Sequence, residues 1–263
     1  MRPVTVAMRG GVAHVVLSRP DQGNAIDLAT ANGLLDAANR CRSDDVRVVV
    51  LSGRGRSFCV GGDLREFSAL SGDALAGHLR AVTGALHDAL RGFAALDAPL
   101  VAAVHGAVAG AGVGLAAAAD LTIAAADTRF VLAYTGVGYS PDAGVTWSLP
   151  RLAGPKRALD LLLTNRPLGA REALEIGLVS RVADDLAGEA ARVAAGLADG
   201  ATAAFGATRR LVAAGLATGL DHHLDREAEA LAAAAVSAEG AEGVAAFLAK
   251  RPARFAHRQE TTP

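Results

Sequence analysis

The sequence predicts an α/β fold followed by a helical C-terminal region. Short apolar runs alternate with longer segments of helical periodicity over most of the chain, and glycine-rich turns follow several of these runs. From about residue 184 onward the chain consists almost entirely of helix-forming residues and has no strand signal. We therefore predict a core of strands and helices over residues 1–195 and a helical region over residues 196–263.

Five short runs have the length and composition of buried strands and are bounded by glycine, proline or polar residues. They lie at residues 14–18, 46–51, 100–104, 120–124 and 178–182.

Helices are predicted between these strands. Asp27 has the side chain of an N-cap for a helix that runs to about residue 42, and helical periodicity returns between residues 74 and 96. Ser140 followed by Pro141 predicts a further helix that starts there, with Ser140 as N-cap and Pro141 at the first helical position. The single tryptophan, Trp147, is expected in the core.

The composition is that of a soluble globular protein. The chain has 263 residues, of which 51% are hydrophobic and 20% charged, and its net charge of -1 gives no reason to expect a nucleic-acid partner. No apolar run has the character of a membrane span or signal peptide, so we expect no membrane partner. Cys41 and Cys59 lack CxxC spacing, and the adjacent His222 and His223 do not share a helix face. We expect a cytoplasmic protein without a metal site.

Three glycine-rich segments follow predicted strands, at residues 57–64, 105–114 and 140–144. Glycine permits positive φ angles and lets backbone N–H groups approach a ligand closely. Two such turns at strand ends can direct two amides at one oxygen atom. That arrangement is an oxyanion hole, in which the loss of one donor typically costs about 3–4 kcal/mol.

The segments resemble those of the crotonase (enoyl-CoA hydratase/isomerase) family. Ser57-Phe-Cys-Val-Gly-Gly-Asp-Leu64 and residues 105–120 resemble its two oxyanion segments, residues 14–25 its N-terminal signature, and residues 242–255 its C-terminal helix and tail. The resemblance covers essentially the whole chain in order. It implies a crotonase-like spiral of ββα turns and a C-terminal region that mediates assembly into a homotrimer or a dimer of trimers.

The resemblance also implies site residues. The backbone N–H groups of Gly62 and Ala111 would hold the thioester oxygen, and Tyr134 and Tyr139 would line the acyl pocket. Coenzyme A would enter as part of the acyl-CoA substrate, with no tightly bound cofactor. Its expected contacts are Asn24, Ala25, Ile26, Gly61, Asp63, Leu64 and Lys250. Asp63 could instead order its loop by accepting backbone N–H bonds, and Lys250 could instead be a solvated cation at a helix end.

One departure from the family pattern decides the predicted chemistry. Hydratases of the family activate a water with two glutamates, whose positions are taken here by Gly114 and Tyr134. A tyrosine of ordinary pKa is a poor base at neutral pH. Asp142 resembles the acidic residue of the family's enoyl-CoA isomerases, including the epoxyphenylacetyl-CoA type. We therefore predict an isomerase in which Asp142 shuttles one proton, although the same acid could simply belong to the first turn of a helix that starts at Ser140.

Other functions remain open at this stage. The chain could be a hydratase with a non-standard site, a non-catalytic acyl-CoA-binding homologue, or a crotonase that catalyses ring isomerisation, hydrolysis or dehalogenation. A dinucleotide site is disfavoured, because Leu115 stands where a GxGxxG motif requires its last glycine.

Overall fold

Two sheets form the centre of the computed structural model, which describes residues 2–255. The larger sheet has six strands in the spatial order β1-β2-β3-β4-β6-β9, and the smaller has three in the order β5-β7-β8. The pairs β1–β2 and β7–β8 are antiparallel, and all other neighbouring strands are parallel. The strands are β1 (Val4–Arg9), β2 (Val12–Leu17), β3 (Val48–Gly53), β4 (Leu100–Val104), β5 (Ala107–Ala109), β6 (Leu121–Ala125), β7 (Arg129–Val131), β8 (Leu168–Gly169) and β9 (Arg181–Ala183).

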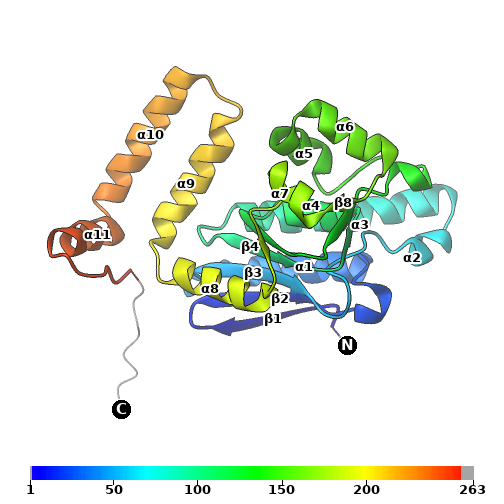
Figure 1. Ribbon diagram of the computed structural model, residues 1–263, viewed down its shortest axis with the longest axis horizontal. Coiled ribbons are helices and arrows are strands. Elements are labelled where there is room, and N and C mark those ends of the chain that lie inside the picture. Colours follow the sequence, from blue (N-terminus) through cyan, green and yellow to red (C-terminus); the bar gives the residue numbers. More distant parts are fainter. Residues whose placement is uncertain (1, 256–263) are drawn as a thin grey trace, which may run out of the picture.

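Helices surround the sheets (Figure 1). They are α1 (Leu28–Arg40), α2 (Leu64–Ser68), α3 (Gly72–Ala94), α4 (Ala111–Ala117), α5 (Val145–Ala153), α6 (Pro155–Thr164), α7 (Ala170–Glu175), α8 (Leu186–Ala198), α9 (Thr202–Gly215), α10 (Leu220–Ala235) and α11 (Ala238–Leu248). Short 3-10 turns lie at Pro20–Gln22 and Thr135–Val137.

The central strands are covered on both faces, which explains their unbroken apolar runs. Every residue of β4 is buried, as are the first four residues of β3. Side chains of α8, including Val193 and Ala194, pack on one face of the sheet. The main core lies on the other face, where α1 and α3 approach so closely that a Cβ on Gly92 would come within 2.9 Å of the Cβ of Ala38.

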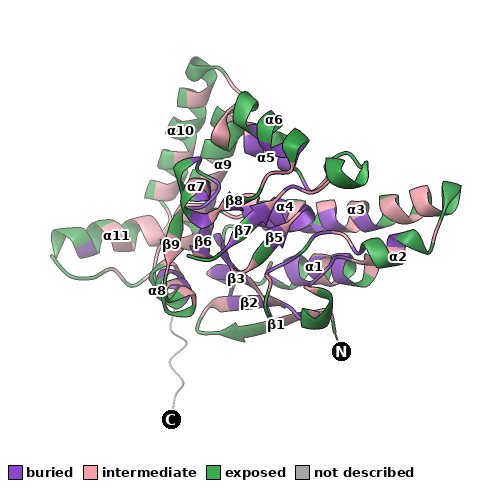
Figure 2. Cartoon of the chain, turned by 45° about the vertical axis from the view of Figure 1, so that its right-hand side comes forward, coloured by how far each residue is buried: buried purple, intermediate pink, exposed green. Residues whose placement is uncertain are grey.

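Helices α9 to α11 stand away from the sheets (Figure 1). No residue of α10 is buried (Figure 2). Arg209 anchors α9 to the core, because its Nε lies 2.7 Å from a carboxylate oxygen of Asp120 and its guanidinium also donates to backbone carbonyls that follow α3. Large apolar side chains remain exposed on these helices: Val212, Leu216, Leu220, Leu224, Leu231, Val236, Val244, Phe247 and Leu248.

Within residues 2–255, no single helix has the length and apolar character of a membrane span. Helices α10 and α11 pass that test only as a pair, and they meet at a bend of 75°.

The structure confirms the α/β core, the helical C-terminal region and the N-cap at Asp27, whose carboxylate accepts the Thr30 N–H at 2.7 Å. It contradicts the helix start at Ser140, because α5 begins at Val145 with Gly144 as N-cap. Trp147 is 56% exposed and lies outside the core.

The predicted boundary at residues 195–196 falls inside α8, which continues to Ala198. The part of the predicted C-terminal region after residue 255 lies outside the described residues.

Candidate active site

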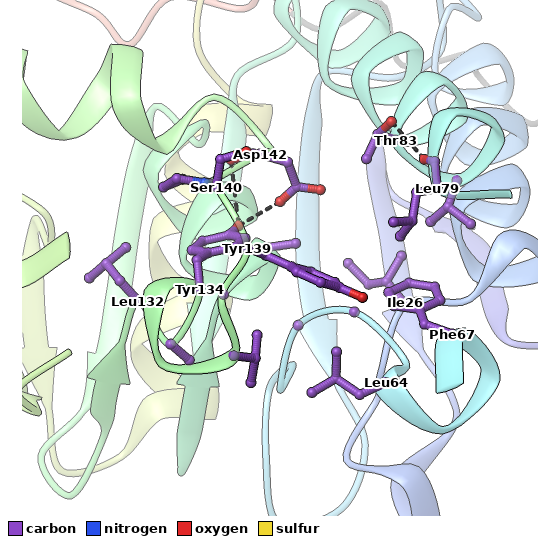
Figure 3. A pocket seen from close by; sticks show the side chains of 18 of the residues that line it. Ile26, Leu64, Phe67, Leu79, Thr83, Leu132, Tyr134, Tyr139, Ser140 and Asp142 are labelled. Atoms are coloured by element: carbon purple, nitrogen blue, oxygen red, sulfur yellow. Dashed lines mark hydrogen bonds between the residues drawn. The ribbon is translucent and has the colours of Figure 1, made fainter. Parts of the chain in front are cut away.

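A cavity of about 460 Å³ lies where the glycine-rich turns converge. Helices α2 and α3 form one side, the segment 132–142 forms the other, and the loop at residues 60–62 and the start of α4 form the floor (Figure 3). The lining is mostly apolar. Its apolar side chains include Ile26, Val60, Leu64, Phe67, Leu79, Val82, Leu86, Leu132 and Val137, and the segment opposite α3 contributes the polar side chains of Tyr134, Tyr139, Ser140 and Asp142.

Two backbone amides on the floor of the cavity are free. Ile26 donates its N–H to Gly61 O at 2.7 Å and accepts the Asp63 N–H at 2.9 Å, and this parallel bridge leaves the Gly62 N–H unused. Ala111 is the first residue of α4, so its N–H has no acceptor within the helix. Among the hydrogen bonds of residues 2–255, neither amide has a protein acceptor. Both residues line the same cavity, so the two amides are candidate donors to an oxyanion.

The two turns that carry these amides are in backbone contact. Ala109 donates its N–H to Cys59 O at 2.8 Å. A Cβ on Gly61 would lie 3.0 Å from Ala109 O, and Gly61 has a φ of 93°. A side chain at Gly61 would therefore push apart the two turns that carry these amides.

Asp142 directs a carboxylate into the cavity, and Tyr134 holds it. The Tyr134 hydroxyl donates to Asp142 Oδ1 at 2.6 Å (Figure 3). Burial raises the pKa of Tyr134 well above its usual value, and the negative charge of Asp142 raises it further. Tyr134 therefore stays protonated and acts as a donor rather than a base. Among the described residues that line the cavity, Asp142 is the one with a carboxylate.

Position 114, where a hydratase of the family has its first glutamate, has no room for a side chain. A Cβ on Gly114 would lie 2.5 Å from the Cβ of Ala143 and 2.6 Å from its carbonyl oxygen. Ala143 is buried and has a φ of 50°. The turn that carries Asp142 thus fills the space beside α4.

His87 is a neighbour of the site that the sequence did not reveal. It lies on α3, and its Nε2 accepts the Ala143 N–H at 3.2 Å. A histidine on a long helix has no sequence signal that links it to a turn 56 residues later.

The predicted coenzyme A loop is built around Arg19. The Arg19 guanidinium donates to Ala25 O at 2.7 Å and pairs with the carboxylates of Asp27 and Asp63, each at 3.0 Å. Asn24 is buried and has a φ of 58°, and its side chain is fully engaged with backbone groups of the surrounding loops.

Three of the expected coenzyme A contacts reach the cavity, namely Ile26, Gly61 and Leu64. Asn24 and Ala25 lie behind them as supports for the loop. Asp63 is the N-cap of α2, accepts the Glu66 N–H at 3.4 Å and pairs with Arg19, so its carboxylate orders the loop.

Lys250 is not brought to this cavity within one chain. It is exposed and follows α11, which lies at the opposite end of the molecule from α2 (Figures 1 and 2). A contact between Lys250 and the ligand of this site would need a neighbouring copy. Residues 2–255 contain no cluster of three or more His, Cys, Asp or Glu side chains suited to a metal ion.

The chain is similar to known proteins in both sequence and fold. A sequence model described as enoyl-CoA hydratase/isomerase matches residues 7–258. The chain is 41% identical over 251 residues to a Rhodobacter capsulatus protein named "probable enoyl-CoA hydratase". The matched region covers 94% of this chain and 95% of that protein. The chain is 36% identical over 248 residues to 1,2-epoxyphenylacetyl-CoA isomerase of Escherichia coli, with 93% and 95% covered. The crystal structure of an enoyl-CoA hydratase from Polaromonas sp. JS666 has a TM-score of 0.89, 32% identity, and covers 95% of this chain and 98% of that one.

Proposed function

Because the chain belongs to the enoyl-CoA hydratase/isomerase (crotonase) family, we propose that it moves the double bond of an enoyl-CoA thioester, with Asp142 as the proton shuttle. The observation that supports this proposal best is that two residues with free amides and a single carboxylate line the same cavity. A double-bond shuttle needs one acid–base group, whereas a hydratase of the family uses two such groups to activate a water.

The reaction follows from the position of these groups. The ionised carboxylate of Asp142 takes a proton from C2 of a 3-enoyl thioester, and the electron pair moves into the thioester carbonyl. The Gly62 and Ala111 N–H groups stabilise the negative charge on the dienolate oxygen. Protonated Asp142 then returns the proton to C4, which gives the 2-enoyl thioester and restores the carboxylate.

Tyr134 supports this role of Asp142. Its hydroxyl engages Oδ1 at 2.6 Å and leaves Oδ2 for the substrate. A hydrogen bond to a charged group is short and strong, so it holds the carboxylate in one orientation. The apolar walls from α3 exclude water from the dienolate, which disfavours hydration of the product.

The test is a paired spectrophotometric assay of wild type and Asp142→Asn, with 3-enoyl-CoA and 2-enoyl-CoA supplied separately. We expect wild type to isomerise 3-enoyl-CoA and the variant to be about 10²-fold slower or worse, as for a removed acid–base group. Wild-type hydration of 2-enoyl-CoA that survives the substitution would instead support the activity named for the Rhodobacter relative. Binding of acyl-CoA without turnover in either protein would support a non-catalytic homologue.

We also propose that the chain assembles as a homotrimer or a dimer of trimers through its C-terminal helices. The exposed apolar side chains on α9 to α11 support this, because contiguous exposed apolar surface commonly marks an interface. Sedimentation equilibrium of the purified protein tests the assembly directly.

A further inference from the structure

The turn that carries Asp142 is held in an unfavourable backbone conformation. Ala143 has a φ of 50° and Gly144 a φ of 73°, so two consecutive residues lie in the left-handed region. Glycine adopts this region readily, but alanine does so at a cost because of its Cβ atom. Such a conformation persists only where neighbouring groups hold it, and it is commonly found beside active sites.

The side chain of His87 on α3 holds this turn by a hydrogen bond. Its Nε2 accepts the Ala143 N–H at 3.2 Å, and no other acceptor for this amide occurs among residues 2–255. An acceptor nitrogen carries a lone pair, so this hydrogen bond requires the tautomer with its proton on Nδ1. His87 is half-buried on α3 and does not line the cavity.

The other side of the turn rests on α4. Ala143 is only 2% exposed, and it occupies the space that a side chain on Gly114 would need. The turn is therefore wedged between α3 and α4. Packing against Gly114 limits how far the turn can move inward, and the hydrogen bond to His87 fixes the direction of the Ala143 amide.

We propose that His87 is a positioning residue for the isomerase, a role that rests on the function proposed above. Tyr134 fixes the carboxyl group of Asp142, whereas His87 fixes the backbone from which that carboxyl group projects. Without His87, the Ala143 amide loses its partner and the turn relaxes away from its left-handed conformation. Asp142 then no longer reaches both C2 and C4 of the thioester.

Two substitutions at His87 separate positioning from mere packing. Leucine fills similar space but cannot accept a hydrogen bond, whereas the glutamine Oε1 can reach the place of Nε2. We expect His87→Leu to lower kcat by about 10- to 100-fold with KM little changed, as when a catalytic group is displaced by an ångström or less. His87→Gln should recover most of that loss. Asp88→Asn, at the exposed next residue on α3, is the control and should leave kcat unchanged.

An Ala143→Gly background provides a second, independent measurement. Glycine has no strain at a φ of 50°, so the turn depends less on His87 when residue 143 is glycine. We expect His87→Leu to reduce kcat less in that background than in the wild-type background. Equal losses in both backgrounds would overturn the link between His87 and the strained turn.

Other outcomes are equally decisive. A folded His87→Leu variant with wild-type kcat, or a folded His87→Gln variant as slow as His87→Leu, would overturn the proposal. If wild type fails to isomerise 3-enoyl-CoA but turns over another acyl-CoA through Asp142, the isomerase assignment fails and the same variants are assayed with that substrate. If no turnover is found, ¹⁵N spectra of the histidine side chains decide: a protonated Nε2 on His87 would overturn the hydrogen bond, and an unprotonated one would support it.

Discussion

Replacing Gly114 with alanine tests whether the turn that carries Asp142 packs on α4. Alanine is the better helix former by about 1 kcal/mol, so propensity alone favours the variant. The new Cβ, however, would lie 2.5 Å from the Cβ of Ala143 and 2.6 Å from its carbonyl oxygen. Carbon atoms normally approach to about 3.5–4.0 Å, so the turn must shift by about 1 Å. Overpacking of this kind costs about 1–3 kcal/mol.

The matched control is Gly84→Ala on α3, where a new Cβ would meet no atom within 4 Å. This variant should gain about 0.5–1 kcal/mol from the same change in propensity. Because both variants gain the same propensity, they should differ by the overpacking cost of about 1–3 kcal/mol. For a chain of this size, a difference of that magnitude separates their melting temperatures by about 2–12 °C.

Thermal unfolding at equal protein concentration measures the loss of stability. Steady-state kinetics measure the effect of the shifted turn on kcat. A shift of about 1 Å in the turn should lower kcat of Gly114→Ala by up to about 100-fold while Gly84→Ala stays at the wild-type value. If Gly114→Ala has the same melting temperature as Gly84→Ala and keeps the wild-type kcat, the turn does not pack on α4 and the reasoning from Gly114 is wrong.

Three further predictions concern other parts of the molecule. Tyr134→Phe removes the hydrogen bond to Asp142, which at about 1.5–3 kcal/mol for a charged acceptor should lower kcat by about 10- to 100-fold in a steady-state assay. Arg19→Gln breaks the contacts that join the loop at Ala25 and Asp27 to Asp63, so the melting temperature should fall by about 2–8 °C; an unchanged value would contradict this role. Burial raises the pKa of Cys41 to about 11 and that of Cys59 to about 12, so neither thiol should react with Ellman's reagent at pH 8 until the chain is unfolded. Because these folded-state pKa values are raised, the corresponding stability is present below pH 9 and is lost as the pH rises toward them, which denaturant titrations at pH 8 and pH 10 will measure.

The sequence was sufficient where local pattern and tertiary environment agree. The strand Leu100–Val104 was predicted with its observed bounds, because an unbroken apolar run between Pro99 and His105 is what a strand covered on both faces requires. Asp27 was predicted as an N-cap because capping depends only on the residues of the first turn. The family resemblance implied Gly62 and Ala111 as oxyanion donors, and both residues line the same cavity.

Prediction from sequence failed where distant contacts override a local signal. Ser140 and Pro141 have the pattern of a helix start, but the helix begins only at Val145 because the intervening turn is tied to other parts of the chain. Trp147 lies on the exposed side of α5, where the Arg151 guanidinium stacks over its ring at 4.1 Å from the ring centre. An apolar side chain alone does not indicate which face of a helix it occupies.

The two departures from the hydratase pattern are contacts of the same turn. Gly114 has no side chain and so leaves space for Ala143, and the Tyr134 hydroxyl donates to the carboxylate of Asp142. Restoring the glutamates should therefore not restore a hydratase. A glutamate at position 114 would displace the turn, and one at position 134 would put a second negative charge beside Asp142, where like charges repel. We expect the Gly114→Glu/Tyr134→Glu variant to lose isomerisation of 3-enoyl-CoA without hydrating 2-enoyl-CoA. Hydration of 2-enoyl-CoA by that variant would show that the turn yields to the restored side chains and that Asp142 does not depend on it.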